Sequence, residues 1–180
     1  MVECSLAEPH YIKCVDLWRG PAIIVAAGQA TGRVSLVSFG SSSQPASTDL
    51  VRRTEFSPKQ PRNCAALAWH PAEQSLLAVG FDRMRSDCGL LVWDVSAGEG
   101  RLVEVGQPGD HCSSLAWVGR SSSSLAAGLN GRTVRIFDTR ANPQKHVAGT
   151  QTKATFGLRY VGTLTLFSKI NVLYSSFLLL

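Results

Sequence analysis

Residues 64–69 read CAALAW, residues 76–79 read LLAV and residues 90–95 read LLVWDV. These apolar segments have the length of β-strands and are too short for typical helices. Turn-forming residues separate them, because His70-Pro71 follows the first segment and Gly80 and Asp82 follow the second. Proline cannot donate a ladder hydrogen bond, so strand pairing ends there. The order predicts an antiparallel β-meander over residues 63–95.

The same order of three apolar segments occurs in residues 12–39 and again in residues 111–140. A leucine of the first segment recurs after 50 and 48 residues, at Leu17, Leu67 and Leu115. The glycine that ends the second segment recurs after 52 and 48 residues, at Gly28, Gly80 and Gly128. We align the three copies position by position on these residues. A period of this size, with Trp-Asp closing the third segment, is typical of WD-repeat propeller blades.

A propeller blade also needs a fourth, outer strand. Weaker candidates lie at residues 49–56, 102–105 and 145–148. The sequence therefore predicts an all-β fold, a partial WD-repeat β-propeller of about three four-stranded blades. Its expected organisation is an unassigned N-terminus at 1–10, the partial propeller at 11–154 and a divergent apolar C-terminal tail at 155–180.

Composition and charge exclude some function classes. The formal net charge is +5, but the basic residues are spread singly or in pairs. Nucleic-acid grooves need a clustered basic stripe with aromatic residues for stacking, so we expect no nucleic-acid binding. Residues 1–10 hold no basic region followed by an apolar core, which is unlike a signal peptide.

Five cysteines without a Cys-x-x-Cys pair favour a reduced, cytoplasmic setting. Cys14, Cys64 and Cys112 each precede a repeat leucine by three residues. Recurrence once per blade indicates a packing role for these small apolar side chains. Equivalent positions in neighbouring blades are expected to lie too far apart for a disulfide, which needs Cα atoms within ~7 Å of each other.

Sequence motifs of known chemistry are absent. The pair Gly28 and Gly32 lacks the Lys-Ser/Thr of a phosphate-binding loop, and no nucleophile elbow or metal-binding His pair occurs. We therefore predict no enzyme activity, with no catalytic, cofactor-binding or metal-ligating residue. The closing pairs of the third segments are assigned structural roles at the repeat positions Trp93, Asp94, Phe137 and Asp138.

One loop is longer than its counterparts. Gly80 and Leu90 are ten residues apart, against six between the matching residues of the other two copies. The extra residues include Arg83, Met84 and Arg85, which predicts a protein-contact loop; a longer solvated turn is the alternative.

The polar residues that connect well-formed WD blades are incomplete. Those blades link a His before the first strand, an Asp in the second turn and the Trp by hydrogen bonds. The central copy has Asp82, but Arg62 stands near the place of the His. The third copy has His111, but Asn130 replaces the Asp and Phe137 replaces the Trp. We therefore expect the blades to depend on apolar packing more than on polar networks.

Several longer segments together resemble the Mio (missing oocyte) family of WD-repeat proteins. They are residues 11–15 (YIKCV), 28–34 (GQATGRV), 64–71 (CAALAWHP), 90–94 (LLVWD), 125–132 (LAAGLNGR) and 136–140 (IFDTR). The resemblance extends over about residues 11–154.

This resemblance implies a non-catalytic scaffold subunit of the activating GATOR complex, which promotes amino-acid-dependent TOR signalling at lysosomes. Its implied partners are other proteins, above all other WD-repeat subunits of that complex. It also implies a cytoplasmic protein that meets the lysosomal membrane only peripherally, through the complex. Members carry an α-solenoid and a zinc-binding RING-like end after the propeller, and this sequence shows no counterpart of them.

Residues 155–180 leave three interpretations open. The first is the start of a degenerate fourth blade, because LRYVG at 158–162 mirrors LAWVG at 115–119. The second is a membrane anchor over residues 160–180, against which Lys169 counts, since a central Lys costs about 2.5–3.5 kcal/mol on insertion. The third is an alternative coding end.

The divergent tail and the small number of blades suggest an alternative interpretation of the function of the chain. An open array of about three blades would expose two apolar faces. The chain would then be a truncated or alternative-end product with little independent activity, or a tail-anchored propeller fragment.

Overall fold

The computed structural model describes residues 11–19, 23–39, 51–97, 101–119, 123–152, 157–160 and 164–167. The first sheet contains β1 (Ile12–Arg19), β2 (Ile23–Gln29), β3 (Val34–Phe39) and β4 (Val51–Phe56). The second contains β5 (Cys64–Trp69), β6 (Leu76–Phe81), β7 (Cys88–Asp94) and β8 (Arg101–Pro108). The third contains β9 (Cys112–Trp117), β10 (Ser124–Leu129), β11 (Thr133–Asp138) and β12 (Asn142–Gln151).

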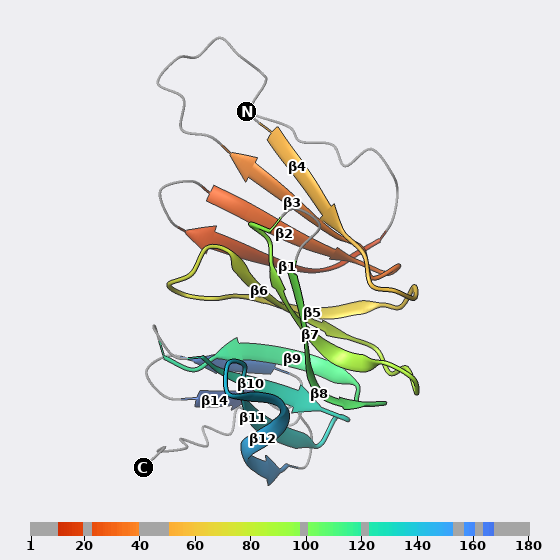
Figure 1. Ribbon diagram of the computed structural model, residues 1–180, viewed down its shortest axis with the longest axis vertical. Helices are drawn as coiled ribbons and strands as arrows, with labels where there is room; N and C mark the ends of the chain where they lie inside the picture. Colours follow the sequence, from red (N-terminus) through yellow and green to blue (C-terminus); the bar gives the residue numbers. More distant parts are fainter. Residues whose placement is uncertain are drawn as a thin grey trace.

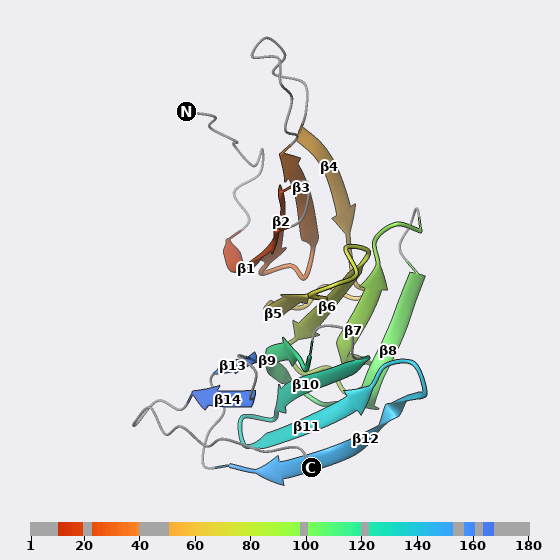
Figure 2. The same ribbon diagram turned by 90° about the vertical axis from the view of Figure 1, so that its left-hand side faces the viewer.

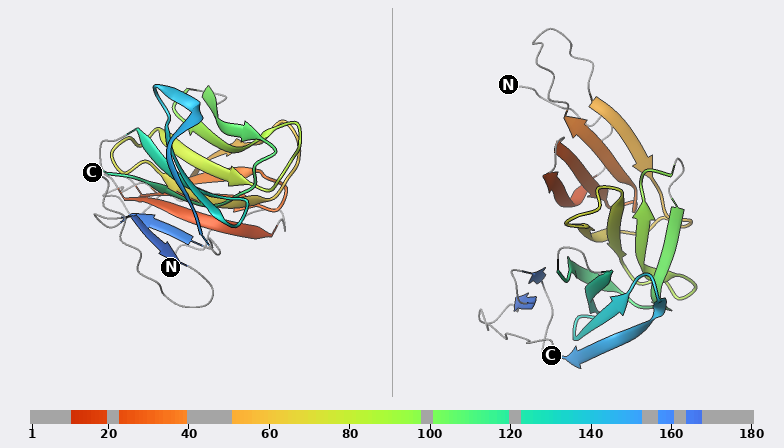
Figure 3. Two further views of the ribbon diagram at one scale, coloured as in Figure 1. Left: turned by 90° about the horizontal axis from the view of Figure 1, so that it is seen from below. Right: turned by 60° about the vertical axis from the view of Figure 1, so that its left-hand side comes forward.

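Each sheet is an antiparallel meander in chain order, from an inner first strand to an outer fourth strand. The sheets, blades 1 to 3 below, follow one another along the long axis of the molecule (Figures 1 and 2). The inner strand β5 lies between the inner strands β1 and β9 and contacts both (Figure 3). This arrangement confirms the predicted all-β, partial WD-repeat propeller.

The outer strands were the weakest sequence signals, and the structure contains all three. The predicted segments 49–56, 102–105 and 145–148 correspond to β4, β8 and β12. In blade 3, β12 is longer than expected and its pairing with β11 is interrupted twice, on either side of Phe137.

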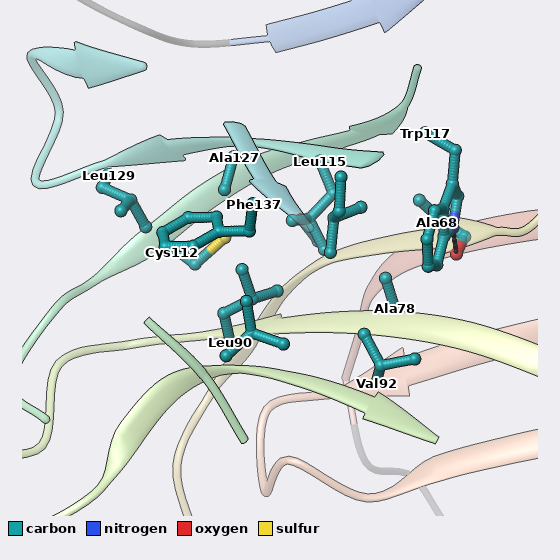
Figure 4. Close-up of a cluster of buried hydrophobic side chains, with 13 residues drawn as sticks. Ala68, Ala78, Leu90, Val92, Cys112, Leu115, Trp117, Ala127, Leu129 and Phe137 are labelled. Atoms are coloured by element: carbon teal, nitrogen blue, oxygen red, sulfur yellow. Dashed lines mark hydrogen bonds between the residues drawn. The ribbon is translucent and has the colours of Figure 1, made fainter. Parts of the chain in front are cut away.

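Blade 2 owes its strong apolar pattern to burial on both faces. One face packs against blade 1, where the rings of Phe56 and Trp93 lie 5.1 Å apart. The opposite face packs against blade 3, where Leu90, Val92 and Leu115 share one cluster (Figure 4). The result is a β7 strand whose first six residues are all buried. Burial of a large aliphatic side chain contributes roughly 1.5–3 kcal/mol, so these two interfaces dominate the stability of the blade.

The turn after β5 is closed by a histidine. Nδ1 of the buried His70 accepts hydrogen bonds from the backbone N–H groups of Ala72 (3.2 Å) and Glu73 (2.9 Å). Its ring also meets Trp117 of blade 3 edge-on, with centroids 4.7 Å apart. One side chain therefore shapes the turn and contacts the next blade.

The inner strand of blade 1 corrects the predicted alignment. Leu17 pairs with Val25, three residues before Gly28, whereas Leu67 and Leu115 pair with the residue directly before the repeat glycine. Equivalent positions are therefore Val15, Leu67 and Leu115. The first strand is offset by two residues, and a two-residue offset keeps every side chain on the same face. The hydrophobic pattern alone could therefore not reveal this two-residue offset.

Cys64 and Cys112 pack in the buried clusters between blades, as predicted, but the expectation that Cys14 and Cys64 lie far apart was wrong. Sγ of Cys14 and Sγ of Cys64 lie 3.5 Å apart, across the interface between blades 1 and 2. Because of the offset, Cys14 is equivalent to Ala66 and Ser114, which pair with the repeat glycines. It therefore faces the following blade, and inner strands of neighbouring blades approach closely enough for thiol contact.

The described part of the tail forms a hairpin of β13 (Gly157–Tyr160) and β14 (Leu164–Phe167). The β13 strand lies against β9, as β9 lies against β5 (Figure 2). These strands agree with the first interpretation of the tail, the start of a fourth blade. Most of the candidate anchor at 160–180 lies outside the described residues. Among the residues that are described, no helix is long and apolar enough to cross a membrane.

Candidate protein-interaction site

The loop between β6 and β7 extends as a small hairpin from blade 2. Met84 and Asp87 form an isolated bridge, and the N–H of Asp87 donates to the carbonyl of Met84 at 3.4 Å. Arg83 and Arg85 are exposed and Met84 is partly buried. The protein-contact role of these three residues stays a prediction, and the loop presents the two arginines to solvent.

A buried arginine holds the base of this loop. Nη2 of Arg62 lies 2.9 Å from a carboxylate oxygen of Asp87 and donates to the carbonyl of Cys88 at 2.8 Å. The guanidinium also lies over the ring of Phe81, with 4.6 Å to its centroid. Burial lowers the pKa of Arg62, and the neighbouring charge of Asp87 opposes that shift. Both ends of the loop are therefore fixed by one side chain.

In the sequence, Arg62 stands out only because it lies near the place of the missing histidine. Its side chain is 3% exposed and stands just before β5, so it replaces the absent polar partner with an ion pair of its own. The signal that could have predicted this ion pair was a basic residue just before the first strand together with an acidic residue in the enlarged loop.

Blades 2 and 3 are also joined by polar contacts. Nδ1 of His111 lies 3.4 Å from an Asp82 carboxylate oxygen. The Asn130 side chain accepts from the His111 N–H at 3.0 Å and donates to Asp110 at 2.7 Å. Arg135 donates to the other oxygen of Asp110 at 3.2 Å. The expected reliance on apolar packing is thus supplemented by a polar network built around the Asn that replaces the usual Asp.

The four residues predicted to have structural roles lie in the interfaces between blades and in turns. Trp93 and Phe137 are buried in the interfaces on either side of blade 2. Asp94 accepts from the N–H of Ser96 at 3.1 Å and closes the turn after β7. Asp138 accepts from Ser123 and from the N–H groups of two turn residues, and these hydrogen bonds lower its pKa. The carboxylates thus bond to turn backbone.

A groove lies on the outside of the interface between blades 2 and 3. Its volume is about 520 Å³, and Phe137 lies at its base where β12 departs from regular pairing. Its rim is polar, with Arg135, Lys145 and His146 contributing basic groups. The sequence did not predict this groove, because it depends on irregular pairing in an outer strand. No group of three residues suited to a metal ion occurs within the described ranges.

These blades can be compared with known proteins. The sequence model of the family described as "MIOS, WD40 repeat" matches residues 4–101. The chain belongs to this family. That membership confirms the resemblance to Mio proteins, and the match covers blade 1 and most of blade 2.

Similar curated proteins carry matching names. This MIOS-family chain is 35% identical over 172 residues to GATOR2 complex protein MIOS-A of Xenopus laevis, covering 81% of the chain and 19% of that protein. It is 28% identical over 151 residues to GATOR2 complex protein Mio of Drosophila melanogaster, covering 83% and 16%. The chain thus spans less than a fifth of the length of these relatives.

Solved structures share the fold. The chain matches Sqt1 of Saccharomyces cerevisiae with a TM-score of 0.64 at 10% identity, covering 90% of this chain and 45% of that one. A chain of the Mitotic Checkpoint Complex gives 0.56 at 14% identity, covering 82% and 41%. These neighbours are WD40-like, and at such identities they show the fold alone.

Proposed function

We propose that this chain is a non-catalytic protein-interaction scaffold that acts in a GATOR2-type complex. Its membership in the MIOS WD40-repeat family carries the proposal, together with relatives named as GATOR2 complex proteins. WD-repeat propellers present loops and outer strands on a rigid framework, and such surfaces suit protein partners. The partners proposed are other WD-repeat subunits of that complex.

The blade 2 loop is the proposed contact. Arg83 and Arg85 are exposed, while Arg62 fixes the loop base through Asp87 and Cys88. A pre-organised loop loses little conformational freedom on binding. Its paired positive charges fit an acidic patch on the partner, and charges at an interface rim mainly speed association.

The loop proposal is tested by co-precipitation of complex subunits with the tagged chain from cells. The variant Arg83→Glu/Arg85→Glu should capture at least ~tenfold less partner, with a stronger effect at low salt. The matched control is Arg132→Glu/Lys13→Glu, which reverses two exposed charges outside the loop and the groove and should capture the wild-type amount. Equal capture by the loop variant would remove the loop from the interface. Failure of the wild-type chain to capture any complex subunit would contradict the scaffold role.

The proposal extends to signalling and location. The resemblance to Mio proteins supports a role in amino-acid-dependent TOR signalling and a cytoplasmic protein with peripheral association to the lysosomal membrane. Refeeding starved cells with amino acids should restore TOR-substrate phosphorylation less in cells that express the loop variant in place of the native chain. An unchanged response, with the loop variant no longer binding the complex, would separate this chain from TOR signalling.

A further inference from the structure

Two thiols from neighbouring blades lie in contact. Sγ of Cys14 on β1 and Sγ of Cys64 on β5 are 3.5 Å apart, although the residues are 50 positions apart in the sequence. A disulfide needs an S–S distance of about 2.05 Å and Cβ atoms within ~4.5 Å. The two sulfur atoms must therefore approach each other by about 1.5 Å to form a covalent bond.

Backbone features of both strands produce the contact. The inner strands carry a β-bulge at equivalent places, between Ile12 and Cys14 and between Cys64 and Ala66. The bulge directs Cys64 toward blade 1, into the cluster that joins the two blades. A Cβ atom on Gly28 would lie 2.5 Å from the Cys64 sulfur and 2.7 Å from the Cys14 sulfur. The absence of a side chain at Gly28 thus creates the space that both thiols occupy.

The two thiols are chemically unequal. Cys14 is partly buried, whereas Cys64 is fully buried. The contact with the Cys64 thiol lowers the pKa of Cys14, while the same contact and burial raise the pKa of Cys64. A thiol must be reached by the oxidant and must ionise to act as the nucleophile, so the partly exposed Cys14 is the reactive member and the buried Cys64 the resolving member of the pair.

We propose that Cys14 and Cys64 form an oxidative modification site, which a hydroperoxide converts into a disulfide between blades 1 and 2. The Cys14 thiolate attacks a peroxide oxygen and the O–O bond breaks, giving a sulfenic acid and an alkoxide or hydroxide that takes up the proton lost by Cys14. The Cys64 sulfur then attacks the Cys14 sulfur, the S–O bond breaks, and the Cys64 proton leaves with the hydroxide as water. Two thiols and one hydroperoxide thus give one disulfide, one alcohol or water molecule, and one water.

The next interface provides an internal comparison. Cys112 projects toward blade 2 beside Gly80, just as Cys64 projects toward blade 1 beside Gly28. The position equivalent to Cys14 is here Ala66, so the second thiol is missing. Burial raises the pKa of Cys112 to about 12, which suppresses its thiolate. The interface between blades 1 and 2 thus holds both thiols, whereas the interface between blades 2 and 3 holds only the thiol of Cys112.

The sequence suits a direct test, because each of the five cysteines falls on its own tryptic peptide. The full chain is treated with hydrogen peroxide, its remaining thiols are alkylated, and its peptides are mapped without reduction. We expect loss of two thiols per chain and a linked species joining peptide 14–19 to peptide 63–83. The melting temperature should rise after oxidation and return to its starting value with a thiol reductant, because the bridge restricts the unfolded chain.

Two variants are compared, so that the test still gives a result if one of them folds poorly. Cys14→Ala copies the Ala66 arrangement of the next interface and should abolish both the linked peptide and the rise in melting temperature. Cys112→Ala should retain both. Cysteines linked in other combinations, bridges between two chains, or equal thiol loss in Cys14→Ala would overturn the proposal. So would full retention of thiols in the wild-type chain at peroxide levels that oxidise its urea-unfolded form.

Discussion

The carboxylate of Asp87 lies 2.9 Å from the guanidinium of Arg62, and the two side chains are 15% and 3% exposed. One residue precedes the inner strand of blade 2 and the other ends its enlarged loop. The ion pair therefore closes the loop from within the blade. Its burial makes it different in kind from the exposed pairs on the surface.

Removing Arg62 should destabilise blade 2. Arg62→Met leaves the Asp87 carboxylate buried without its partner, which typically costs about 3–5 kcal/mol. The free energy of unfolding, measured by urea titration, should fall by that amount. The double variant Arg62→Met/Asp87→Asn should recover part of it, because the orphaned charge is gone. Arg140→Met is the control: its pair with Glu73 is largely exposed, so its loss should cost no more than ~1 kcal/mol.

Gly28 should not tolerate a side chain while Cys64 is present. The added Cβ atom of Gly28→Ala would lie 2.5 Å from the Cys64 sulfur, so the side chains packed there would have to shift. Overpacking of this kind costs about 1–3 kcal/mol. The double variant Gly28→Ala/Cys64→Ala should be more stable than the two separate costs predict, since the closest of the clashing atoms, the Cys64 sulfur, is removed. Strictly additive unfolding free energies would contradict this account.

Trp117 should contribute a hydrogen bond as well as packing. Its indole N–H donates to the carbonyl of Ala68 at 3.0 Å, across the interface between blades 2 and 3 (Figure 4). Trp117→Phe should therefore lower the unfolding free energy by about 1–2 kcal/mol more than the loss of ring area alone. Trp69→Phe is a matched control, because the Trp69 side chain is similarly buried and its indole N–H has no partner within the described part of the chain. Equal costs for both variants would argue against the hydrogen bond.

The pH dependence of stability should include a contribution from Asp138. Hydrogen bonds from the turn and from Ser123 hold the folded pKa of Asp138 below its usual 3.8. A depressed carboxyl pKa gives stability that is present above the unfolded value and is lost as pH falls through the folded value. Asp138→Asn should thus be less stable than the wild type near neutral pH, and the difference should shrink below about pH 3.8. Urea titrations at several pH values check this; a difference that is constant down to pH 2 would contradict it.

The sequence by itself determined the blades. Short apolar segments, turn residues and the repeat glycines place the strands of all three meanders, because alternating burial and turn chemistry are local properties. The third strands share one register, since Val37, Trp93 and Phe137 each pair with the residue three before the repeat glycine. Family resemblance could be identified from the same segments.

The tertiary structure alone decided how neighbouring blades meet. A shift of two residues leaves a strand's apolar pattern unchanged, so the offset of β1 could not be seen in the sequence. A bulge reverses the direction of Cys64 without any change in composition. The Cys14–Cys64 contact, the Arg62–Asp87 ion pair and the groove over Phe137 all join residues that are distant in the chain. Such contacts depend on strand offset and bulges, which only the packed blades fix.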